Sequence, residues 1–540
     1  MIFLAKNRTN LFFSGVLILT VANILVKAIG LLYKIPLQNL IGDEGMGYFN
    51  AAYRIYTMFY MVSTAGLPVA VSLMISESRA KGNRREVKEI FKAAVILFVI
   101  IGTLGTSFMF FGSKILASVI KMEASYLCMM AISPTLLFIC ICSAVRGYFQ
   151  GYQNMLPTAV SEVLEALGKL ILGMLLGTFA IKQGYSLPTV AAYAILGLTI
   201  GVFAGSFYIV MHRTFFKSEE FDAEFVEDEN AIVRSKGTIM KTLFKIAIPI
   251  TISASVMSVA DAVDVVVISR QLQSLGFTEE IAAQYYGNYT TLCVPMFNLP
   301  PVLIYPISYS IVPYISSALA EKNTQKAKDV MTSSLKIAAL IAIPSALGLS
   351  AMSKPILSLI FMNEASVDMA APLLSVLALS VFFLGILSVS NALLQATKNE
   401  RLPIISMVAG AVVKLLSSYF LIGNKAIGMY GAPIGTFLCY LTITALNMAF
   451  LVKKVGLVPD FKEVFFKPFL ASVPAVLSAW LCYRFMAGIH SKLATLVAIC
   501  AAVVVYFIAV LLFRLIKKEE VLMIPKGNKI YGLLHKMKLM

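Results

Sequence analysis

The sequence predicts an all-α membrane protein with fourteen transmembrane helices. Of its 540 residues, 59% are hydrophobic and only 14% are charged, whereas a soluble domain carries about 25% charged residues. The apolar residues form windows long enough for a helix to cross a hydrocarbon core, which needs about 20 residues. The 45 Lys and Arg residues gather mainly in alternate loops between these windows. Together these observations indicate a multi-pass protein of a lipid bilayer.

Fourteen apolar windows follow one another along the chain. The first one follows Lys6 and Arg8, and it is too long for the core of a secretory signal, with no small-residue cleavage site after it. The eighth contains five prolines, which predict a bent or broken helix because proline interrupts helical hydrogen bonding. Such a helix serves either a conformational change or only a fixed kink. The windows lie at residues 11–33, 48–75, 90–112, 125–147, 156–181, 187–212, 242–269, 284–315, 330–352, 370–396, 403–423, 427–452, 467–487 and 492–514.

The charges of the loops predict the orientation. Most Lys and Arg residues fall on the side that holds both termini, for example at 79–92 and after residue 514. By the positive-inside rule that side is cytoplasmic. This topology accounts for the net charge of +17, so we expect no nucleic-acid partner. An acid-rich linker at 213–241 and a basic tail at 517–540 have the composition of cytoplasmic segments.

Two stretches of the sequence are repeated. "ISESRAKGN" (75–83) returns as "ISSALAEKN" (315–323), and "FQGYQNMLPTAVSEVLEALGK" (149–169) returns as "LQATKNERLPIISMVAGAVVK" (394–414). An even number of predicted helices separates each pair, so both copies have the same orientation in the membrane. Parallel repeats are a transporter architecture with the substrate path between the halves; a purely structural duplication is the alternative. The predicted parts are a six-helix lobe at 1–212, the linker at 213–241, a second six-helix lobe at 242–452, helices 13 and 14 at 453–516, and the tail at 517–540.

Side chains of catalytic or metal-binding type are scarce. The three histidines lie near segment ends and far apart in sequence, and the seven cysteines lie in or beside apolar windows without metal-ligand spacing. The sequence therefore predicts no enzyme, no bound metal, no disulfide framework and no cofactor.

Cations inside the windows are the candidate substrate-binding residues. A charge near the bilayer centre costs about 2.5–3.5 kcal/mol, so it normally faces the bundle interior or a watery cavity. Lys27 lies deep in the first window and shares a helix face with Lys34, whereas Arg54 lies nearer the outer end of the second window. Arg54 alternatively reaches the interface with its long side chain. Lys169 and its repeat counterpart Lys414 lie near mid-membrane.

Acidic residues accompany these cations. Glu165 lies four residues before Lys169, a spacing that allows an ion pair within the helix; this pair either takes part in substrate binding or only neutralises itself. Asp261 and Asp264 lie three residues apart in the seventh window, with hydroxyl-bearing residues nearby. Carboxylate oxygens suit hard cations, so this pair is a candidate for coupling to Na⁺ or H⁺. A counter-ion role toward Lys27 is the alternative.

Four stretches resemble the MATE-like flippases of the multidrug/oligosaccharidyl-lipid/polysaccharide exporter superfamily, and within it the SpoVB- and MurJ-like polysaccharide biosynthesis branch. They are "LYKIPLQNLIGDEGMGYFNAAYRIY", "RGYFQGYQNMLPTAVSEVLEALGK", "YPISYSIVPYIS" and "LLQATKNERLP". The resemblance covers nearly the whole chain and implies two six-helix lobes plus two added helices. It also implies a flippase of the bacterial plasma membrane. Such a protein moves an undecaprenyl-pyrophosphate-linked sugar, a peptidoglycan precursor or another polysaccharide unit, to the outer leaflet by alternating access. We expect a monomer.

The resemblance also bears on individual residues. Lipid II flippases have a cationic cavity in the N-terminal lobe, and Lys27 and Arg54 fall in the matching helices. Cations there would hold a pyrophosphate in a low-dielectric space. The chain departs from the Gram-negative members, which share an arginine in helix 8, because 284–315 contains none, and it lacks the helix 11 acids of Na⁺-binding members. A MATE-type drug/cation antiporter is the alternative function, although that class commonly carries an Asp in helix 1.

Overall fold

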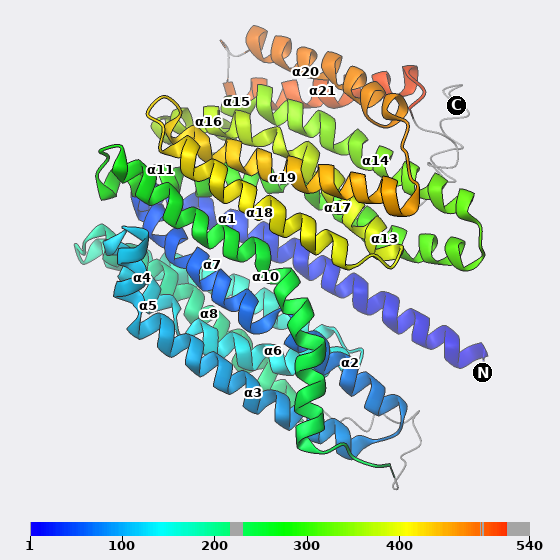
Figure 1. The fold of residues 1–540 in the computed structure, drawn as a ribbon. Helices are drawn as coiled ribbons and strands as arrows, with labels where there is room; N and C mark the ends of the chain where they lie inside the picture. The colour runs from blue at the N-terminus through cyan, green and yellow to red at the C-terminus, as the bar shows by residue number, and fades with distance from the viewer. Residues whose placement is uncertain (1, 216–230, 487, 489–490, 516–540) are drawn as a thin grey trace. The chain divides into compact units, whose positions relative to one another are not determined.

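The computed structural model describes residues 2–215, 231–486, 488 and 491–515. Within these residues every regular element is helical (Figure 1). The predicted basic tail lies outside the described residues, as does the acid-rich part of the predicted linker.

The chain divides into two compact units, residues 1–287 and 288–540. The elements of the first unit are α1 (Ile2–Thr64), α2 (Leu67–Ala80), α3 (Arg84–Phe111), α4 (Ser113–Ile120), η1 (Glu123–Ser125), α5 (Tyr126–Ile132), α6 (Thr135–Gly151), α7 (Leu156–Lys182), α8 (Leu187–Phe215), α10 (Lys236–Ser274) and α11 (Glu279–Asn288). Those of the second unit are η2 (Tyr289–Cys293), α12 (Val294–Asn298), α13 (Pro301–Ala320), α14 (Thr324–Ala351), α15 (Ser353–Ile360), α16 (Glu364–Ala378), α17 (Ser380–Ala396), α18 (Arg401–Ile422), η3 (Gly428–Tyr430), α19 (Gly431–Phe450), η4 (Leu451–Val455), η5 (Lys462–Phe466), α20 (Lys467–Met486) and α21 (Ser491–Leu512).

The length and composition of the helices confirm the predicted all-α membrane fold. Among the described residues, 12 helices are long and apolar enough to cross a membrane, or 13 if the bent pair α16 and α17 forms one span. The first two predicted windows share α1, which is broken at Gly42, where φ is 66°; glycine adopts this conformation readily because it has no Cβ. The proline-rich eighth window is broken, as predicted, into α11, η2, α12 and α13. The total of fourteen helices, the cytoplasmic termini and the lobe boundaries stay predictions.

The helices α7 and α8 form the most extensive helix contact of the first unit, and they lie side by side in Figure 1. Glycines allow the two backbones to approach closely, since a Cβ at Gly168 of α7 would lie 2.4 Å from the Cα of Gly201 on α8. Such small-residue contacts are how membrane helices pack tightly. Because α7 also packs against α1, the polar residues of α1 and α7 come together within the unit.

The helix α10 packs against α1 and α2 of the first unit, although the sequence places it at the start of the second lobe. Its attachment has three parts. Before the helix begins, Arg234 forms an ion pair with Glu86 of α3. Near the middle, the backbone N–H of Gly66 donates to Thr251 Oγ1 at 3.1 Å. Toward the other end, Arg270 Nε donates to a backbone carbonyl of α4 at 2.6 Å. These contacts hold the predicted seventh helix along α1.

The structure confirms the internal repeat at the level of single turns. Asn83 and Asn323 each accept a hydrogen bond at 3.0 Å from the backbone N–H three residues later, and so begin α3 and α14 in the same way. The turns after α6 and α17 also match, because Gln153 and Lys398 adopt φ values of 58° and 61° at corresponding positions. The sequence similarity therefore reflects repeated local structure.

In the second unit, α17 is the central helix and packs against α13, α14 and α19. Two further helix pairs of the second unit pack extensively, α18 with α19 and α20 with α21. The helix α20 also lies against α14. A buried apolar core runs between α13, α14 and α17 and reaches η5.

Candidate functional site

Lys169 of α7 is held by aromatic rings of α1. Its Nζ lies 5.1 Å from the ring centroid of Tyr33 and 4.9 Å from that of Tyr53. Tyr33 is fully buried, and its hydroxyl donates to the carbonyl oxygen of Ala194 at 3.2 Å, which fixes the ring. The electron-rich face of an aromatic ring attracts a cation and stabilises it most where water is scarce. The two rings therefore stabilise a positive charge inside the first unit.

Arg54, also on α1, pairs with the helix α10. Its Nη1 lies 3.0 Å from Asp261 Oδ2, and about a third or less of either side chain is exposed, 27% and 34%. Asp264 and the hydroxyl of Tyr286 also act electrostatically on the guanidinium. Asp261 is thus a counter-ion of Arg54 in this structure; its alternative role as a counter-ion of Lys27 stays a prediction. A role of Asp261 and Asp264 in coupling to Na⁺ or H⁺ stays a prediction.

Lys34 adds a third cation to this region. It is half-buried on α1, and its charge acts on those of Lys169 and Arg54. Lys27, about two turns earlier on the same helix, is exposed. We call Lys34, Arg54 and Lys169 the cationic cluster. The three basic side chains lie close enough for their charges to act on one another, so the cluster attracts anions.

A second charged group lies near the start of α7, where Arg146 of α6 contacts side chains of α7. Arg146 Nη2 donates to Glu165 Oε1 at 2.7 Å, and its Nε and Nη2 donate to Ser161 Oγ at 3.0 and 2.8 Å. Glu162 lies farther away, with its Oε1 4.0 Å from Arg146 Nη1. Arg146 itself is buried. We call Arg146, Glu162 and Glu165 the Arg146 triad.

The triad differs from the pairing suggested by the sequence. The spacing of Glu165 and Lys169 allowed an ion pair within α7, but Glu165 binds Arg146 and Lys169 lies over the two tyrosine rings. The apolar window that predicts this helix ends at residue 147, just after Arg146. In the structure α6 continues to Gly151, which places Arg146 inside the helix. Two acids on one helix stripe were the signal that a cation from another helix was needed.

Lys414, the repeat counterpart of Lys169, lies in the second unit. It is buried in α18. The structure therefore places the predicted substrate-binding residues Arg54, Lys169 and Glu165 in the first unit, and Lys414 in the second; their role in binding stays a prediction. Among the described residues, His, Cys, Asp and Glu side chains form no group of three or more that suits a metal ion.

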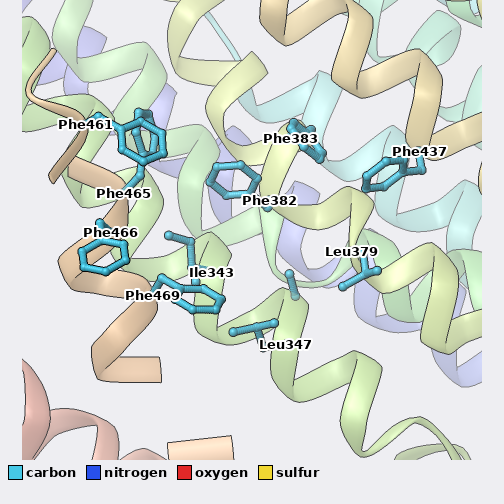
Figure 2. Close-up of a pocket in the computed structure, with 11 residues that line it drawn as sticks. Ile343, Leu347, Leu379, Phe382, Phe383, Phe437, Phe461, Phe465, Phe466 and Phe469 are labelled. Carbon is cyan, nitrogen blue, oxygen red and sulfur yellow. The ribbon is translucent and has the colours of Figure 1, made fainter. Parts of the chain in front are cut away.

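The second unit also contains an apolar cavity of about 320 Å³. Phenylalanine rings from α17, α19, η5 and α20 surround it, as Figure 2 shows, together with aliphatic side chains of α14. The cavity suits a hydrocarbon chain, because its wall offers almost no polar partner. Its lining residues are Ile343, Ala346, Leu347, Leu379, Phe382, Phe383, Phe437, Phe461, Phe465, Phe466 and Phe469.

An all-helical membrane protein with an internal parallel repeat and interior charges has the architecture of a transporter. Solved structures of transporters share this fold. A lipid II flippase MurJ in an inward closed conformation superposes with a TM-score of 0.67 at 16% identity, over 92% of this chain and 98% of that one. A multidrug resistance MATE family transporter of the MOP superfamily, in an inward-facing conformation, gives 0.62 at 16% identity, over 81% and 94%. The fold is therefore that of MATE-like transporters.

The chain belongs to the polysaccharide biosynthesis protein family, whose model matches residues 12–319, more than half of its length. The MatE family model matches residues 249–420. Among curated relatives, stage V sporulation protein B of Bacillus subtilis is 25% identical over 95% of this chain and 98% of its own length. The lipid II flippase MurJ of the same organism is 24% identical over 79% of this chain and 80% of its own.

Proposed function

We propose that the protein is a flippase of the bacterial plasma membrane. It moves an undecaprenyl-pyrophosphate-linked sugar, a peptidoglycan precursor such as lipid II or another polysaccharide repeat unit, from the inner to the outer leaflet by alternating access. The observation that carries the proposal is the cationic cluster of Lys34, Arg54 and Lys169 inside the first unit. A pyrophosphate cannot enter a low-dielectric space without nearby cations, since an isolated buried charge is strongly unfavourable.

The mode in which the cations are held supports a binding role. Lys169 lies over aromatic rings, and such contacts are weaker than charge-assisted hydrogen bonds to phosphate. Lys169 therefore leaves the rings for a phosphate oxygen at small cost. Arg54 keeps Asp261 as its partner and retains further N–H donors for a ligand.

The aromatic cavity of the second unit supports a lipid-linked substrate. Its wall of phenylalanine and aliphatic side chains accommodates a segment of a prenyl chain, which has no hydrogen-bonding groups to satisfy. The lipid II flippases among the relatives and the solved structures support the same class of substrate.

Depletion of the protein identifies the substrate. We expect one undecaprenyl-pyrophosphate-linked sugar to accumulate in the inner leaflet, measured by extraction and mass spectrometry, with leaflet position determined by accessibility to an external modifying enzyme. Accumulation of none would contradict the proposal.

Replacement of single cations tests the binding site. We expect Lys34→Ala, Arg54→Ala and Lys169→Ala each to lower flipping of the substrate in proteoliposomes about tenfold or more, which corresponds to about 1.4 kcal/mol of lost interaction. The exposed Lys88 of α3 provides the matched control, and Lys88→Ala should flip at the normal rate. Normal rates in all three site variants would remove the cationic cluster from the mechanism.

A MATE-type drug/cation antiporter is the second candidate, because the MatE family model matches residues 249–420. The two functions differ in the charge that they require. An antiporter for cationic drugs needs acidic groups at its site, so the Ala variants of the cationic cluster should leave drug export intact or raise it. Export of cationic dyes by proteoliposomes, with Asp261→Asn as the variant expected to abolish it, distinguishes the two.

A further inference from the structure

The Arg146 triad contains one more negative charge than positive charge. Arg146 donates to Glu165 at 2.7 Å, whereas Glu162 is 4.0 Å away, beyond hydrogen-bond distance. Among the described residues, Arg146 is the cation whose charge acts on Glu162. Lys169 follows Glu165 by one helical turn, but its Nζ lies over the tyrosine rings. The guanidinium therefore compensates one carboxylate and leaves a second within the membrane region.

The elements packed on this part of α7 bring no further cation among the described residues. From α6, the Sγ of Cys142 lies 3.7 Å from Glu165 Oε1. From α1, the phenol groups of Tyr56 and Tyr60 lie within the electrostatic field of the triad. From α8, Gly205 lies directly against the Glu165 side chain. Residues 18–25 of α1 form the apolar wall of a groove against α7; Lys27 follows them, and its charge is not among those that act on Glu162. Apart from Lys27, these neighbours hold no permanent positive charge.

We propose that Glu162 and Glu165 share one exchangeable proton, and that this proton controls the binding of substrate by the cationic cluster. The coupling rests on the proposed flippase function; the proton site does not. Two carboxylates that share one counter-ion cannot both remain ionised at low cost in a membrane interior, so they titrate as a pair and hold a proton between them. Glu162 carries it, because Arg146 donates its hydrogen bond to Glu165. The Glu162 side chain is 26% exposed, so the proposed proton site is not sealed inside the unit.

The proton changes the net charge of the triad from −1 to zero, which links it to the cationic cluster. Lys169 lies four residues after Glu165, a rise of about 6 Å along the helix and a spacing at which a Glu attracts a Lys. With the proton absent, the surplus negative charge draws Lys169 toward the triad. With the proton bound, that attraction disappears and Lys169 is available to an anionic headgroup. Proton binding thus favours substrate binding.

Infrared difference spectroscopy tests the proton site without reference to transport. Purified protein in lipid is titrated from acid to alkaline pH, and the C=O stretching band of protonated carboxyl groups is followed. We expect the wild type to lose a band on titration that is absent from Glu162→Gln, whose side chain makes no hydrogen bond to Arg146 and whose fold should persist. It should also be absent from Glu165→Gln, because Arg146 then pairs with Glu162.

The exposed Glu321, which pairs with Lys326, provides the control, and Glu321→Gln should keep the band. Persistence of the band in both Glu162→Gln and Glu165→Gln would overturn the proton site.

A transport measurement tests the coupling separately. Flipping in proteoliposomes should rise in the wild type as the pH is lowered on both sides of the membrane, and Glu162→Gln should lose that dependence. If the wild type flips its substrate at a rate independent of pH, the coupling is wrong while the flippase function stands. If the band titrates but no lipid-linked sugar is flipped, the proton site stands and the proposed function fails.

Discussion

The two copies of the repeated element share a backbone but not a chemistry. In the first copy, Arg146 before the α6–α7 turn donates hydrogen bonds to Glu165 and Ser161 after it. In the second copy, the residues at the corresponding positions are Asn391, Gly410 and Ser406. There Asn391 Oδ1 accepts a hydrogen bond at 2.7 Å from the Asn447 side chain of α19. Of the three corresponding positions, only the serine is the same in both copies.

The difference between the two copies at these positions has a steric reason. In the first copy a glycine of α8, Gly205, makes room for Glu165 on α7. In the second copy the glycine lies on the other helix, since Gly410 of α18 makes room for Ile443 of α19. The duplication thus preserved the close helix contact, while the first copy alone filled the space with a charge. The comparison indicates that the first unit placed a buried ion pair on a scaffold that both units share.

Replacement of Arg146 or its counterpart Asn391 should give the largest difference in stability between the two copies. Arg146→Met leaves two carboxylates without a counter-ion, and we expect a loss of about 3 kcal/mol in the free energy of unfolding, at the low end for a broken buried ion pair because the carboxyls can take up protons. Asn391→Ala removes only a neutral hydrogen bond and should cost about 1 kcal/mol. Thermal unfolding in detergent measures both. Equal losses would show that the copies do not differ in this way.

A methyl group at either glycine sharpens the steric part of the comparison. A Cβ at Gly205 would lie 2.7 Å from the Cγ of Glu165, and one at Gly410 would lie 2.2 Å from Cγ1 of Ile443. Both Gly→Ala variants should therefore lose about 1–3 kcal/mol of stability through overpacking. Only Gly205→Ala should also disturb flipping, because it moves Glu165 away from Arg146. The melting temperature and the flipping rate distinguish the two effects.

A compensating change provides the control. Ile443→Ala should restore most of the stability of Gly410→Ala by making room for the new methyl group, and it should leave Gly205→Ala unaffected. Restoration of both variants would indicate a general effect on folding in place of local packing.

The sequence predicted those features that depend on local pattern. Hydrophobic windows gave the helical membrane fold, prolines gave the break after α11, and the repeated letters gave the repeated turns. The ion pairs could not be predicted from the sequence, because Arg54 contacts Asp261 only through the packing of α10 on α1. The aromatic partners of Lys169 were missed for the same reason, since Tyr33 lies far from it in the chain. Arg146 was missed because it lies at the end of its apolar window, where a cation is normal at the cytoplasmic end of a helix, whereas α6 continues to Gly151.

The smallest expected effect concerns the turn that both copies share. Gln153 and Lys398 are exposed and adopt left-handed φ values of 58° and 61°, a conformation that costs a residue with a Cβ about 1 kcal/mol. We expect Gln153→Gly and Lys398→Gly each to raise the stability by about 0.5 kcal/mol, since glycine removes the strain but loses more entropy on folding. Ala at either position keeps the strain and should give no gain. Equal gains, measured as shifts in melting temperature, would show that the turn is equivalent in both copies and that their difference begins in the side chains that follow it.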